Sequence, residues 1–144
     1  MSLKSGSRGA AFAGAIAYDV ADNLVLNNPA GSGKTFYVHR SVVGAQNAEE
    51  WTLATTPSSE ISVAGTAVTA VSLQRTLKVG HTTPASVGTL KRGATVDSSS
   101  VVFDIVGAAN LEFLDSFRLE PGFAAVITCA IANQPSMAFE WREE

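Results

Sequence analysis

The segment that most resembles a chemical site is Gly31-Ser-Gly-Lys-Thr35, which ends like a phosphate-binding P-loop. That motif (G-x-x-x-x-G-K-S/T) begins with a glycine, and this chain has Asn28 at the corresponding position. A P-loop also needs a following helix whose N-terminal amides converge on the phosphate. Residues 36–43 are instead β-branched and aromatic, which predicts a strand. We therefore interpret the segment as a glycine turn with an exposed Lys34, and not as a nucleotide site.

The two histidines and the single cysteine form no recognisable metal or nucleophile motif. His39 and His81 lie 42 positions apart, whereas a metal ion needs three or four converging ligands. Cys129, the only cysteine, excludes an intrachain disulfide. Because it lies in an apolar run, it is predicted to be a small buried side chain. We expect no metal and no other cofactor.

Carboxylates are present without a catalytic spacing. Glu49 and Glu50 are adjacent and would face opposite ways in a strand, so we expect them in a solvated turn. Asp104 and Glu112 lie in apolar segments, where a charged group needs a partner inside the fold or at an interface. Paired carboxylates of the glycosidase type stay open at this point, because residues distant in sequence can meet in the fold.

Other candidates for chemistry are equally general. No G-x-S-x-G elbow occurs, although a spatial Ser-His-Asp triad needs no local motif. Trp51 and Trp141 could form a sugar-binding platform, but packing in a core or an interface is the favoured interpretation. The chain is predicted not to be an enzyme, and a small jelly-roll enzyme is retained as a lesser alternative.

The elements that must position these residues are short strands. Apolar side chains alternate with small or polar ones over residues 12–20, so one strand face is expected to be buried. In the strand expected at residues 36–43 the alternation is imperfect, because Arg40 and His39 interrupt it on opposite faces. Further strands are predicted at 23–26, 51–54, 101–106, 111–119, 122–131 and 137–142.

The middle of the chain is predicted to be less regular. Residues 61–64 and 67–73 flank Gly65-Thr66 and could form a hairpin. Residues 80–100 contain several Gly, Pro and Ser and are predicted to be a long loop, with room for a short strand near 87–90. A long loop of this kind is often a functional surface.

Length and composition indicate a single all-β domain. The chain has 144 residues, which is about one domain, and 15 Val, 5 Ile and 12 Thr stand against only 10 Leu. We expect one jelly-roll or β-sandwich domain over residues 10–144. Residues 1–9 are Ser, Gly, Lys and Arg with one Leu after the initial Met, and are predicted to be an extended, flexible N-terminal arm.

Charge and hydropathy exclude two classes of partner. A net charge of −3 with scattered basic residues argues against nucleic-acid binding by charge. No run approaches the ~18 apolar residues that span a bilayer, so no membrane partner is expected. The Ala-rich segment 10–17 is too short and too strand-like for a signal peptide. We therefore expect the protein to be made and folded in a cytoplasm.

Three segments carry a resemblance to a known group of proteins. Residues 24–38 resemble the "strand, N-P-x-G-S-G-K, strand" segment of small tailed-bacteriophage virion proteins. Residues 119–126 are similar to their "L-x-P-G" hairpin, and residues 139–143 to their closing "W-x-E" strand. Together the segments cover a small part of the chain near its two ends, and the group's pattern names no catalytic residues.

The resemblance implies a structural protein of the phage particle. Within that group the best match is a capsid decoration (cement) protein, which would sit on the head exterior as a homotrimer and bridge subunits of the major capsid protein. A tail, fibre or neck component with a receptor- or carbohydrate-binding role is the alternative. Lys4, Arg8 and Phe12 are predicted to contact the capsid or a neighbouring subunit.

The two ends of the chain differ in charge. Lys4 and Arg8 make the arm basic, whereas Glu140, Glu143 and Glu144 make the C-terminus acidic. We expect the arm of one subunit to meet an acidic surface of the next. The entropy lost when the arm becomes ordered would then be offset only where that partner is present.

Overall fold

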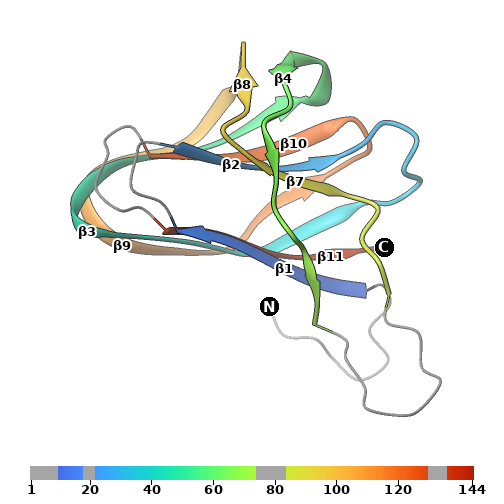
Figure 1. The fold of residues 1–144 in the computed structure, drawn as a ribbon, viewed down its shortest axis with the longest axis horizontal. Coiled ribbons are helices and arrows are strands. Elements are labelled where there is room, and N and C mark those ends of the chain that lie inside the picture. Colours follow the sequence, from blue (N-terminus) through green and yellow to red (C-terminus); the bar gives the residue numbers. More distant parts are fainter. Residues whose placement is uncertain (1–9, 18–21, 74–83, 130–135) are drawn as a thin grey trace.

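Two long antiparallel strands organise the molecule. The computed structural model describes residues 10–17, 22–73, 84–129 and 136–144. In it, β3 (Phe36–Pro57) and β9 (Ser100–Leu119) pair with each other over most of their lengths. The first part of β3 also pairs with β11 (Ser136–Glu143), and its last part with β10 (Phe123–Cys129). The β3–β9 pair therefore passes from one layer of sheet into the other, forming the curved end at the left of Figure 1.

The sequence predicts four shorter strands where these two lie, and that prediction is wrong in one respect. Glu49 and Glu50 do not lie in a turn: both are part of β3, opposite Ala108 and Val106 of β9. Register shifts between Gly44 and Glu49, and again between Glu49 and Glu50, interrupt the ladder. Such irregularities let a strand pair bend sharply without ending, so one continuous strand can serve both layers.

The remaining strands extend each layer from this pair. The β1 layer has the order β6-β1-β11-β3-β9, and the β2 layer has the order β5-β7-β2-β10-β3-β9. The strands not yet introduced are β1 (Ala10–Ala17), β2 (Asp22–Asn28), β5 (Thr66–Ala67), β6 (Val71–Ser72) and β7 (Thr89–Arg92). The predicted all-β sandwich is confirmed, while its jelly-roll connectivity stays a prediction.

A crossing segment spans the edge of the sandwich that lies opposite the β9 edge. Residues 66–72 pair with β7 at their start and with β1 at their end. The N–H of Val68 donates to the carbonyl of Leu90, and the N–H of Leu73 to the carbonyl of Ala11, both at 2.8 Å. This segment therefore links the outer edges of both layers and runs across the front of the molecule in Figure 1.

The predicted hairpin between residues 61–64 and 67–73 does not form. Instead β4 (Ile61–Val63) pairs with β8 (Thr95–Val96) in a separate two-stranded ribbon. Gly65 has φ +77°, and a Cβ at this position would collide with the backbone at the end of β7. The glycine is therefore needed for a close crossing of two chain segments rather than for a hairpin turn.

The main core fills the space between the two layers. Its largest fully buried side chains are Trp141, Phe12, Phe36, Phe139, Leu24, Leu26 and Leu119. The sequence predicts Phe12 to be a contact residue, but the structure leaves its side chain only 1% exposed, with its ring centre 5.8 Å from that of Trp141. The period-two alternation of β1 directs this side chain inward, so Phe12 is part of the core and not of a contact surface.

The two outer faces of the sandwich differ. The β4–β8 ribbon packs over the outer face of the β2 layer, where Val25, Ala124 and Val126 form a second small core with Ile61 and Val96 against it. The 80–100 segment, predicted to be a loop, supplies β7 and β8 to this side. No second ribbon of described residues covers the outer face of the β1 layer. In the described residues, no helix has the length and apolar character to cross a membrane.

Candidate interaction face

The P-loop-like segment is a glycine corner that enters a strand. Gly31 and Gly33 have positive φ angles of 83° and 69°, and β3 begins directly afterwards at Phe36. Lys34 is exposed. Since no helix follows, the segment lacks the converging amides that a nucleotide phosphate requires. The predicted corner into extended chain is confirmed.

Asn28, which takes the place of the missing P-loop glycine, fastens this corner. Its side chain is fully buried, and its Nδ2 donates to the carbonyls of Lys34 at 2.7 Å and Leu119 at 2.9 Å. The Ser32 hydroxyl donates to Asn28 Oδ1 at 2.6 Å. These bonds satisfy a buried carbonyl of one chain segment and a part-buried carbonyl of another, so Asn28 has a structural role.

The three segments that carry the phage resemblance meet at this corner. The N–H of Gly122, in the "L-x-P-G" segment, donates to the carbonyl of Asn28 at 2.8 Å. Thr35 and Glu144, which follows the "W-x-E" strand, exchange two backbone hydrogen bonds of 2.8 and 2.9 Å. The Thr35 hydroxyl also donates to Glu120 Oε2 at 3.0 Å. The motifs therefore form one joint that sets the geometry of the sandwich end.

The "W-x-E" strand ends in a buried carboxylate. Glu143 is 4% exposed and accepts hydrogen bonds from the Trp141 indole at 2.8 Å, the Val87 N–H at 2.9 Å and the Ser86 hydroxyl. These contacts pin residues 84–88 to β11. Trp51 and Trp141 are both buried, so together they form no exposed sugar platform. The burial of Glu143 also removes it from the acidic surface expected at the C-terminus.

On the outer face of the β1 layer, which no other strand of the described residues covers, small side chains from three strands lie together. Ala15 of β1, Ala138 of β11 and Val42 of β3 are register neighbours across three strands. A groove of about 480 Å³ lies over them and is bounded by Val71 and Leu73, which are 37% and 43% exposed. Residue alternation in the sequence indicates a strand face of small residues, but it does not show that the face stays uncovered.

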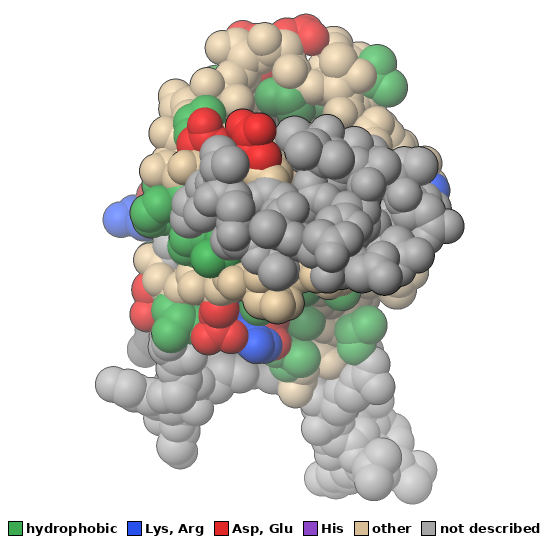
Figure 2. Space-filling model, turned by 90° about the vertical axis from the view of Figure 1, so that its left-hand side faces the viewer, with side chains coloured by type: hydrophobic (Ala, Val, Ile, Leu, Met, Phe, Trp, Pro, Cys, Tyr) green, Lys and Arg blue, Asp and Glu red, His purple; other side chains and the backbone are tan. Residues whose placement is uncertain are grey.

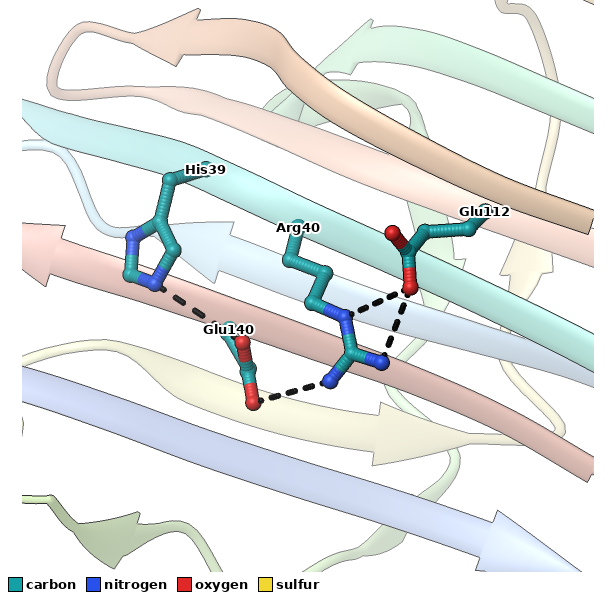
Figure 3. A network of polar contacts seen from close by, with 4 residues as sticks. All are labelled: His39, Arg40, Glu112 and Glu140. Atoms are coloured by element: carbon teal, nitrogen blue, oxygen red, sulfur yellow. Dashed lines mark hydrogen bonds and ion pairs between the residues drawn. The ribbon is translucent and has the colours of Figure 1, made fainter. Parts of the chain in front are cut away.

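A charged network lies at one end of this groove. Arg40 of β3 bridges two carboxylates: its Nη2 lies 2.9 Å from Glu112 Oε2, and its Nη1 lies 3.3 Å from Glu140 Oε1 (Figure 3). The Arg40 Nε also donates to Glu112 at 3.0 Å. Glu112 therefore has the partner that its apolar segment requires, although on the surface rather than in the core. Because these side chains are largely open to solvent, such ion pairs add little to stability.

A β-bulge explains why the alternation of residues 36–43 is imperfect. Val38 pairs with Trp141 and Arg40 with Glu140, so His39 has no register partner on β11. The extra residue reverses the faces: Phe36 and Val38 are buried before it, and Ser41 and Val43 after it. His39 and Arg40 therefore both approach Glu140, as Figure 3 shows.

His39 is buried beside this network without a strong partner. Its side chain is 9% exposed, its Nε2 lies 3.8 Å from Glu140 Oε2, and its Nδ1 has no hydrogen-bond partner among the described residues. Burial lowers the pKa of His39, and the nearby Glu140 carboxylate opposes this shift only in part. The folded protein therefore favours the neutral imidazole.

Stability should consequently fall as the pH drops below about 6.5, the usual pKa of histidine in an unfolded chain. His39 binds a proton more readily in the unfolded chain than in the folded protein. The stability that its neutral form contributes is therefore present above that pH and is lost as the pH falls below it. We expect His39→Gln to remove the part of the pH dependence that lies between pH 7 and 5.5, as measured by urea unfolding. His81→Gln is the matched control and should keep it. An identical slope in all three proteins would contradict this assignment.

The edge strand β9 presents a second apolar surface. In the described part of the chain it pairs only with β3, and Val101, Val102, Phe103 and Leu114 are each more than 40% exposed. The ring of Phe103 stacks on that of Phe113 with centres 4.8 Å apart. Figure 2 shows hydrophobic and acidic side chains side by side on the face at the β3–β9 bend. Asp104 is exposed beside these residues, so it is available to an interface.

The remaining residues singled out in the sequence do not belong to these two surfaces. Cys129 is buried, as predicted. Lys4, Arg8 and His81 lie outside the described residues. Within the described ranges, no group of three or more His, Cys, Asp and Glu side chains is placed to hold a metal ion.

Comparison of the chain with family models, curated proteins and solved structures gave no match. The function must therefore be argued from the surfaces.

Proposed function

We propose that this protein is a non-enzymatic structural component of a tailed-bacteriophage particle, namely a capsid decoration protein. In this role it binds the head exterior and stabilises the shell by bridging major capsid subunits. The observation that carries the proposal is the outer face of the β1 layer, which no other strand of the described residues covers and which borders the part of β9 that carries the exposed Leu114. Interface centres are poor in charge, and the small side chains of Ala13, Ala15 and Ala138 give the middle of this face that character, while the Arg40 network lies at its end.

The rest of the sandwich suits a rigid connector. The corner at Asn28 and the anchor at Glu143 are internal joints, and neither presents a reactive group to solvent. A decoration protein needs several modest contacts that add up because one assembly engages several shell subunits. The homotrimer, the jelly-roll connectivity and the virion location belong to this proposal. The proposal includes neither a nucleic-acid nor a membrane partner.

One observation favours the alternative, a tail, fibre or neck component that binds carbohydrate. Phe103 is 42% exposed at the β9 edge, where its ring stacks on that of the half-buried Phe113, and an exposed aromatic ring can serve as a surface for a sugar. A glycan array separates the two proposals. Saturable glycan binding that is lost in Phe103→Ala would favour the alternative, and no glycan binding would favour the decoration protein.

Deleting residues 2–9 tests the decoration role through the arm. We expect the shortened chain to bind phage heads that lack the protein at least about tenfold more weakly, which corresponds to about 1.4 kcal/mol of lost contact. Occupancy is measured by co-sedimentation of heads with the purified protein. Lys34→Ala, which removes one exposed charge from the corner, is the control and should bind normally. Unchanged occupancy after the deletion would remove the arm from the mechanism.

A further inference from the structure

The groove on the β1 layer has a shape and a charge that fit one segment of this same chain. We propose that the groove of one copy receives the basic arm, residues 1–9, of a second copy. This inference deepens the proposed function, since it rests on the assembly that a decoration protein forms. It also gives the expected contact between arm and acidic surface a specific location.

The walls of the groove suit an extended peptide. Ala13, Ala15 and Ala138 have short side chains that let another backbone approach the sheet closely. Val71 and Leu73 provide an exposed apolar rim along one side. A bulky residue would fill this space, whereas Ser, Gly and Leu, which make up most of the arm, are small enough or apolar enough to occupy it.

The charged network at the end of the groove is opposite in sign to the arm: Arg40 and Glu140 line the groove, and Glu112 pairs with Arg40 beside it. Arg40, Glu112 and Glu140 together carry a net charge of −1, and the Glu112 and Glu140 side chains are still 47% and 28% exposed. Residues 1–9 contain Lys4 and Arg8 and no acidic residue. A cation from the arm can therefore share these carboxylates with Arg40. Partly exposed pairs of this kind weaken with added salt.

A second copy is the better donor of the arm on geometric grounds. The groove is lined by Ala13 and Ala15, only a few residues after β1 begins at Ala10. To reach its own groove, the arm would have to reverse direction immediately and lie on top of the strand that it continues. An arm from a neighbour needs no such reversal, and nine extended residues span about 30 Å.

The direct test uses the chain that lacks residues 2–9, labelled with ¹⁵N, and a synthetic peptide of residues 1–9. We expect saturable amide shifts at Ala13, Ala15 and Ala138. The affinity should fall about tenfold in Ala138→Trp, which fills the groove, and should fall also in Glu140→Gln. Val63→Trp, on the exposed face of β4, is the matched control and should bind normally. No shifts, or shifts confined to β9 or to the β4–β8 ribbon, would overturn the proposal.

Sedimentation of the full-length chain separates the two possible donors. We expect self-association that depends on concentration and is abolished both by the arm deletion and by Ala138→Trp. A full-length chain that stays monomeric while its groove amides show the peptide-bound shifts would mean that the arm binds in its own groove, and the second-copy proposal would be overturned. Both measurements are made without phage heads. Failure of head binding alone would therefore count against the proposed function and not against this contact.

Discussion

Replacing Trp141 with alanine should lower the free energy of unfolding by about 3–5 kcal/mol. The indole is fully buried between the layers, packs beside Phe12, and donates a hydrogen bond to the buried carboxylate of Glu143. The substitution therefore leaves a cavity and removes one of the three donors that solvate that carboxylate. Urea unfolding followed by circular dichroism measures the loss.

Trp141→Phe is the control for this prediction. It keeps an aromatic ring in the core but cannot donate to Glu143, so we expect a smaller loss than for alanine. A loss below about 1 kcal/mol for Trp141→Ala would contradict the described core, because substitutions at exposed positions usually have effects of about 0.5 kcal/mol or less.

Asn28→Gly should lower the free energy of unfolding by about 1–3 kcal/mol, because the carbonyl of Leu119 loses its buried donor and the part-buried carbonyl of Lys34 loses its shorter hydrogen bond. The same change completes the sequence pattern G-x-x-x-x-G-K-T over residues 28–35. We nevertheless expect no saturable ATP or GTP binding, since β3 follows the corner and no helix N-terminus faces it. The variant thus separates sequence pattern from geometry.

The control for Asn28 is Ser32→Ala. Ser32 donates to the Asn28 side chain at 2.6 Å but lies nearer the surface, so its loss should cost about 0.5–1.5 kcal/mol. Nucleotide binding by Asn28→Gly that disappears in the additional Lys34→Ala variant would contradict the interpretation of this segment. If Asn28→Gly has the same free energy of unfolding as the unaltered chain, the hydrogen bonds of Asn28 do not stabilise the corner.

The sequence supports the fold class and the corner well. Val, Ile and Thr are abundant and Leu is scarce, and β-branched residues favour strands over helices. The missing glycine at Asn28 and the β-branched run after Thr35 both point away from a P-loop, and the structure agrees. The conformation of a turn or of a short strand depends mainly on the residues within it, so short sequence patterns predict these features well.

Long-range features could not be predicted in the same way. Strand ends are expected near Gly44 and Glu49, but register shifts against β9 allow β3 to continue, and a single sequence does not show which partner will permit this. The hairpin expected around Gly65 fails for a related reason, because β4 and β6 find partners far away in sequence. Pairing partners are decided by the whole fold.

The candidate interaction face on the β1 layer could be only partly predicted from the sequence. Alternating small residues in β1 indicate a face without large side chains, yet only the structure shows that no other described strand covers that face and that Arg40 lies between Glu112 and Glu140. The same alternation could have assigned Phe12 to the core, since it lies on the inward face with Ile16. Its prediction as a contact residue overlooked that pattern.

Electron cryo-microscopy of intact phage particles that contain this chain tests the central claim most directly. The account predicts density for the sandwich on the outside of the head, seated between shell subunits, with the arm of each copy lying in the Ala138 groove of a neighbour. Particles in which the sandwich occupies the tail or a fibre tip would contradict it.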